Sequence, residues 1–136
     1  MARKPGRRSA TDLSPLELEV MNIIWEMGEC SSAQVIAEYN ERHRPLANTT
    51  IRTVLSNIRK KGYVEVVPSV EPRIRFRPKV TKRAVARRSI KQLLTNLFGD
   101  SPREAIAFLL EEEDIDENEM KAIREMLDAH SQEGEK

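Results

Sequence analysis

The chain has 136 residues, of which 39% are hydrophobic and 33% charged, enough for one modest domain or one domain with an appendage. It has no apolar run long enough to span a membrane and no apolar stretch after its basic start that would make a secretory signal, so we expect a cytoplasmic protein. One cysteine excludes an internal disulfide, and one cysteine with two distant histidines predicts no metal site and no cofactor.

The net charge of +1 conceals two parts of opposite sign. Residues 1–91 carry 19 Lys and Arg against 9 Asp and Glu, a balance of +10. Residues 92–136 carry 4 against 13, a balance of −9. This asymmetry indicates a basic part that meets a polyanion and an acidic part with another role, the alternative being two solvated faces with uneven charge.

The first 12 residues combine four basic side chains with Pro5 and Gly6 and offer no apolar cluster that could pack. We therefore predict a disordered basic arm over residues 1–12. Such an arm would contact phosphates or a minor groove, or serve only as a solubilising tail, and the sequence leaves both readings open.

Two helices are predicted next, each from a start signal followed by apolar residues at helical spacing. Residues 14–17, Ser-Pro-Leu-Glu, form a capping box with proline at the first helical position, and Gly28 ends this helix. Ser31 and Gln34 form a second capping box, and the second helix ends in the polar stretch 43–45. Cys30, between the two helices, is interpreted as a small turn residue.

The third helix is predicted to begin near Asn48 or Thr49, both suitable N-caps, and to end at Gly62. Its apolar residues share one face: Ile51, Val54, Leu55 and Ile58. Its outward face mixes hydroxyl, amide and cationic side chains, which can bond base edges or phosphates, and Arg52 can pair bidentately with guanine. Such a face also occurs as plain solvated surface. The DNA-binding candidates on this helix are Asn48, Thr49, Thr50, Arg52, Thr53, Ser56, Asn57 and Lys60.

The hydrophobic period then changes from that of a helix to that of a strand. Residues 63–67 and 73–77 are predicted strands, and residues 68–72 the turn between them. Ile74 and Phe76 are expected on one face of the second strand. The other face would present three further DNA-binding candidates, Arg73, Arg75 and Arg77. The alternative for this hairpin is a sheet edge protected by charge.

Three more helices are predicted, one over residues 81–98, one opened by the capping box at Ser101 and one opened by Asp116. The last two are short and acidic outside, and they hold more apolar side chains than a small monomer can bury. We therefore predict a twofold partner, the alternative being an intrachain cap on the preceding domain. The expected dimerisation residues are Leu93, Leu94, Leu97, Phe98, Ile106, Phe108, Leu109, Leu110, Met120, Ile123 and Leu127.

Three helices followed by a β-hairpin have the order of a winged helix-turn-helix domain. The predicted fold is mainly α with a small hairpin wing: a winged-helix DNA-binding domain over residues 13–80 and a helical dimerisation domain over 81–130, followed by a disordered tail over 131–136. The polar third helix and the arginine-rich wing occur in this order within the basic part of the chain, and together they favour double-stranded DNA as the partner.

The residues also resemble a known family. The runs 16–25 (LELEVMNIIW), 48–55 (NTTIRTVL) and 58–63 (IRKKGY) are similar to the penicillinase repressor family, the BlaI/MecI/CopY group of winged-helix regulators, over about residues 13–128. The resemblance implies a homodimeric transcriptional repressor that binds an inverted-repeat operator near a promoter. It also implies that Thr50, Arg52 and Thr53 read bases and that the C-terminal helices form the dimer.

Two inducing mechanisms of that family have no counterpart in these residues. Antibiotic-responsive members are cleaved at an Asn–Phe bond, and an ungapped comparison places Phe108 and Leu109 there. Copper-responsive members carry Cys-x-Cys pairs near the C-terminus, whereas this chain has no cysteine after Cys30. We expect neither mechanism, and the resemblance identifies no upstream sensor or protease. The alternative function is a non-specific architectural DNA-binding protein that uses the arm and the wing; no motif predicts an enzyme.

Overall fold

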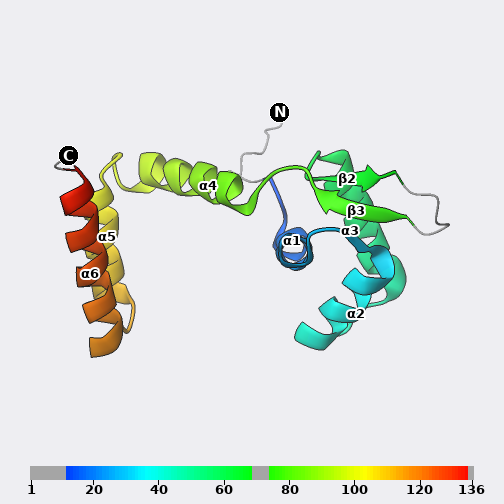
Figure 1. Ribbon diagram of the computed structural model, residues 1–136, viewed down its shortest axis with the longest axis horizontal. Helices are drawn as coiled ribbons and strands as arrows, with labels where there is room; N and C mark the ends of the chain where they lie inside the picture. Colours follow the sequence, from blue (N-terminus) through cyan, green and yellow to red (C-terminus); the bar gives the residue numbers. More distant parts are fainter. Residues whose placement is uncertain (1–11, 69–73, 135–136) are drawn as a thin grey trace. The chain divides into compact units, whose positions relative to one another are not determined.

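The computed structural model describes residues 12–68 and 74–134. Its elements in chain order are α1 (Pro15–Met27), β1 (Cys30–Ser31), α2 (Ser32–Arg42), α3 (Asn48–Lys60), β2 (Val64–Val67), β3 (Arg75–Pro78), α4 (Lys82–Leu97), α5 (Pro102–Glu112) and α6 (Glu117–Gly134). Helices α1 to α3 lie beside the small sheet in Figure 1, which confirms the winged helix-turn-helix order. The predicted arm lies almost wholly outside the described residues.

The chain divides into a first unit, Met1–Gln92, and a second unit, Leu93–Lys136. The division falls inside α4, whereas the predicted boundary, between residues 80 and 81, precedes this helix. The start of α4 belongs with the first unit because Val85 is buried in that unit's core. Trp25 adds a second connection, since its Nε1 donates to the carbonyl oxygen of Val80 at 2.9 Å.

Local capping signals begin the first two helices, as predicted. The hydroxyl of Ser14 accepts the backbone N–H of Glu17 at 3.1 Å, and the Glu17 carboxylate accepts that of Ser14 at 2.9 Å. Ser31 and Gln34 make the same reciprocal pair at 3.2 and 2.8 Å. Each box satisfies backbone donors that a helix leaves without an internal partner.

One apolar core holds the first unit together. α1 supplies fully buried side chains and packs on both α2 and α3, while α3 contributes the face predicted from its spacing. The side chains with no exposed surface are Val20, Met21, Ile23, Ile24, Val35, Ile51 and Ile58. This core fixes the rotation of α3 and therefore decides which of its side chains face solvent.

The sheet has three antiparallel strands in the order β1-β3-β2, one more than the sequence predicted. β1 pairs Cys30 with Phe76, so Cys30 is a buried strand residue rather than part of a turn. Both wing strands are shorter than predicted. Tyr63 precedes β2 as a buried residue, and β3 begins at Arg75 because the pairing with β2 starts there, opposite Val67.

The second unit begins its helices at the predicted signals. Ser101 Oγ accepts the N–H of Glu104 at 3.1 Å, and an Asp116 carboxylate oxygen accepts that of Glu119 at 2.8 Å. α6 continues to Gly134, so the helix extends into the predicted tail, whose last two residues lie outside the described part. In contrast to the first unit, no described side chain of the second unit is buried.

Candidate DNA interface

α3 presents its polar face to solvent. Thr50, Arg52, Thr53 and Ser56 are exposed, and the opposite side of the same helix is buried in the core. Of the other candidates on this helix, Asn48, Thr49 and Lys60 are exposed and Asn57 is half-buried. A helix can place such side chains in a major groove only if no other part of its own domain covers them, and this condition is met for the described residues.

The N-terminus of α3 has no side-chain cap, so the prediction that Asn48 or Thr49 caps it is wrong. The N-cap is Ala47, whose extended backbone (φ −60°, ψ 145°) leads directly into the helix. Its carbonyl oxygen accepts the N–H of Thr50 at 3.0 Å. Asn48 and Thr49 stand in the first turn, where the backbone N–H groups and the positive end of the helix dipole favour an anion such as a phosphate.

The Arg52 side chain extends from α3 to the start of α2. Its Nη1 donates to Ser32 Oγ at the start of α2, at 3.1 Å. A hollow of about 340 Å³ lies there, lined by Ser31, Ser32, Ala33, Arg52 and Ile74. Ile74 and Phe76, predicted on one face of the strand, line a neighbouring hollow together. Ile74 is 55% exposed because it precedes the paired part of β3.

The wing arginines have carboxylate partners that the sequence did not reveal. Arg75 Nε lies 3.0 Å from a carboxylate oxygen of Glu29, and Arg77 Nε lies 2.7 Å from one of Glu65. The two arginines share the outward face of β3, as the alternation predicted. Arg73 lies outside the described residues. No sequence spacing signals Ser32, Glu29 or Glu65 as neighbours of the interface, because their contacts depend on the folded sheet and helices.

A polar cluster lies where α3 ends. Lys61 Nζ bonds the Glu17 carboxylate and the carbonyl oxygen of Asp12, each at 2.7 Å. Tyr63 donates to the Asp12 carboxylate at 2.7 Å and accepts from Arg88 at 3.2 Å. Burial raises the pKa of Glu17, but the bonds from Lys61 and Ser14 outweigh it and lower this pKa below its ordinary value. Burial and the Asp12 carboxylate raise the pKa of Tyr63 to about 12. These bonds connect Asp12, which precedes α1, to Lys61 and Tyr63, which lie between α3 and β2.

The second unit exposes most of the predicted dimerisation residues. The exposed fractions of Leu93, Leu97, Ile106, Phe108, Leu109, Leu110 and Leu127 lie between 45% and 69%. Leu94, Phe98, Met120 and Ile123 are half-buried, and the Phe98 and Phe108 rings lie 5.7 Å apart. An apolar surface of this extent is unusual on a monomer.

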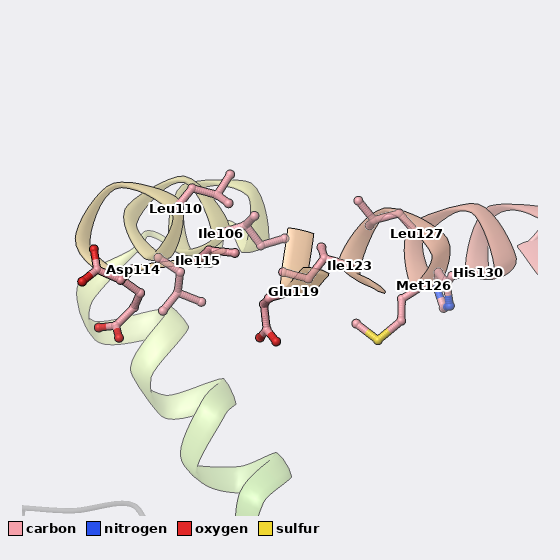
Figure 2. Close-up of a pocket in the computed structure, with 11 residues that line it drawn as sticks. Ile106, Leu110, Asp114, Ile115, Glu119, Ile123, Met126, Leu127 and His130 are labelled. Carbon is pink, nitrogen blue, oxygen red and sulfur yellow. The ribbon is translucent and has the colours of Figure 1, made fainter. Parts of the chain in front are cut away.

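A groove of about 690 Å³ runs between α5 and α6 (Figure 2). Ile106 and Leu110 of α5 line it together with Ile123 and Leu127 of α6, and Asp114 and Glu119 are among its further lining residues. α5 and α6 lie side by side (Figure 1). Their apolar residues are nevertheless partly exposed. This arrangement fits a surface that a further apolar partner covers.

Within residues 12–68 and 74–134, no group of His, Cys, Asp and Glu could hold a metal ion. In the same ranges no helix is long and apolar enough to cross a membrane.

Comparison with known proteins places these features in context. The model of a family described as penicillinase repressor matches residues 13–129. A penicillinase repressor of Staphylococcus aureus is 22% identical over 116 residues, which cover 85% of this chain and 90% of that protein. The methicillin resistance regulatory protein MecI of Mammaliicoccus sciuri is 26% identical over 116 residues, which cover 85% of this chain and 93% of that protein. Among solved structures, Streptococcus pneumoniae FabT in complex with DNA is 21% identical with a TM-score of 0.45, covering 91% of this chain and 77% of that one. The family match extends over both units.

Proposed function

The chain belongs to the penicillinase repressor family, and from this premise we propose that it is a homodimeric transcriptional repressor that binds an inverted-repeat operator near a promoter. As a member of a repressor family, it is not an enzyme. The observation that carries the proposal is α3, whose polar face is exposed and whose N-terminus has no side-chain cap. Arg52 and Ser56 of this face line one hollow with Phe76 of the wing.

In this proposal, affinity and sequence preference come from different residues. The first turn of α3 and the basic side chains bind phosphates, which makes affinity steeply dependent on salt. Thr50, Arg52 and Thr53 reach base edges, and each lost base contact costs about 1–3 kcal/mol. The contact with Ser32 holds the Arg52 guanidinium at the start of α2.

The second unit supports the homodimer. Its exposed apolar residues and the groove between α5 and α6 match a self-complementary surface, in which the same patch of two copies meets about a twofold axis. A twofold dimer would present two α3 helices to two half-sites, which is why an inverted repeat is the expected operator. The surplus of acidic residues in this unit disfavours its lying on DNA.

The test is quantitative binding to the DNA upstream of the protein's own gene, with excess unrelated duplex present. We expect discrete protection with twofold symmetry for wild type and its loss for Arg52→Ala. Arg103→Ala, which removes the same charge from an exposed position of α5, is the matched control and should leave protection unchanged. Diffuse binding that the competitor removes, unaffected by Arg52→Ala, would instead support the architectural alternative.

A further inference from the structure

We propose that Glu29 and Glu65 compete with DNA phosphates for the wing arginines Arg75 and Arg77, and thereby limit the protein's affinity for DNA other than its operator. The inference deepens the proposed function and rests on it. In this inference the carboxylates of Glu29 and Glu65, which form ion pairs on the surface, contribute to DNA specificity.

The pair of Arg77 and Glu65 is built into the hairpin. The two residues stand directly opposite each other in the antiparallel pairing of β2 and β3, so their side chains project from the same face of the sheet. Arg77 Nε lies 2.7 Å from a Glu65 carboxylate oxygen. The Arg77 side chain is 51% exposed and that of Glu65 40%. A DNA phosphate can therefore reach the Arg77 guanidinium and replace the carboxylate as its partner.

The pair of Arg75 and Glu29 lies at the other edge of the same strand. Glu29 precedes β1, and β1 pairs with β3 through Ser31 and Arg75. Arg75 Nε lies 3.0 Å from the Glu29 carboxylate, and its Nη2 lies 3.5 Å from the backbone carbonyl oxygen of Glu29. The two described arginines of the wing are therefore both neutralised by carboxylates that the sheet brings to them.

Neutralised arginines add little to sequence-independent binding. A free arginine that meets a phosphate releases about 0.9 of a condensed cation into solution, which drives non-specific association. An arginine that is paired with a carboxylate must break this ion pair before it binds a phosphate. The carboxylate is then left without its partner and attracts a cation from solution, which offsets the cation released from the DNA. On the operator, base contacts of α3 hold the wing against defined phosphates, so the exchange is favoured there more than on other sequences. The resulting difference in binding free energy between the operator and other DNA is the specificity of the protein.

The test uses full-length Glu65→Gln, which keeps the size of the side chain and removes its charge. Dissociation constants are measured for an unrelated duplex and for the protein's upstream DNA between 50 and 200 mM salt. For the unrelated duplex, we expect several-fold tighter binding at the lower salt and a slope steeper by about 0.9 per wing, or about 1.8 per dimer. That slope corresponds to an additional loss of affinity of about tenfold across this salt range. The ratio of operator to non-specific affinity should fall.

Two controls separate this mechanism from a general gain of positive charge. Glu41→Gln removes the same charge from an exposed position of α2 and should change the slope far less. Glu65→Gln combined with Arg77→Gln should bind the unrelated duplex as Arg77→Gln alone does, because the carboxylate acts through that arginine. Glu29→Gln with Arg75→Gln provides the same comparison at the other pair. Thermal unfolding checks that each variant is folded.

The inference is overturned if Glu65→Gln changes the salt slope no more than Glu41→Gln, or if its effect persists without Arg77. The proposed function fails by a different result, namely wild-type protein that shows no preference for its upstream DNA. In that case the measurements on the unrelated duplex still decide whether the carboxylates restrain the wing.

Discussion

Truncating Leu127 tests whether the groove of the second unit is the dimer interface. Leu127 lines this groove from α6 and is 59% exposed. Full burial of a leucine side chain contributes about 1.5–3 kcal/mol, so burial of the exposed part in a dimer would contribute about 1 kcal/mol. A twofold interface contains the residue twice, which makes the expected cost of Leu127→Ala about 2 kcal/mol.

This cost corresponds to a dimer Kd about 30-fold weaker than that of wild type. Sedimentation equilibrium over a range of protein concentrations measures it directly. Ile74→Ala is the matched control, because Ile74 is similarly exposed, at 55%, but belongs to the first unit, and its substitution should leave the dimer Kd unchanged. An unchanged dimer Kd for folded Leu127→Ala would refute the assignment of the groove to the dimer.

Three further predictions concern the first unit. Ile58→Ala empties a fully buried site and should lower the free energy of unfolding by about 2–5 kcal/mol in urea titrations; a loss below about 1 kcal/mol would contradict the core described above. The folded-state pKa of Glu17 is lowered, so its ionised carboxyl stabilises the fold above the ordinary value of 4.5, and this contribution is lost as the pH falls through the lowered pKa. Glu17→Gln should therefore lower the melting temperature at neutral pH, with a difference from wild type that shrinks in acid; a constant difference would argue against the ion pair with Lys61. Burial raises the pKa of the Cys30 thiol, so thiol reagents should modify it far more slowly in native than in urea-unfolded protein, and equal rates would contradict its burial.

Sequence reasoning succeeded where the determining interactions are local. The capping boxes at Ser14 and Ser31 involve partners three residues away, and both form as predicted. The apolar spacing of α3 fixes which of its faces is buried, so the exposed position of Arg52 followed from the same pattern. Local patterns of this kind are the part of a fold that a sequence reveals most directly.

Features that depend on distant partners were missed or misplaced. β1 has only two residues, too few for an alternating pattern, and exists because Cys30 pairs with Phe76 far along the chain. Ile74 follows the alternation of a strand, yet pairing with β2 begins one residue later, which leaves it exposed. The carboxylate that pairs with Arg75 belongs to Glu29, 46 positions earlier in the chain, so no local spacing in the sequence predicts this contact.

The bond between Trp25 and Val80 gives the protein an internal optical probe. Trp25 is the single tryptophan of the chain, and its indole N–H donates to the backbone between β3 and α4. Indole emission responds to hydrogen bonding and to solvent contact, so the fluorescence of the unlabelled protein comes from one known position. Any movement of the segment that leads from the wing into α4, whether caused by DNA or by an inducing signal, would register there as a change of wavelength or intensity.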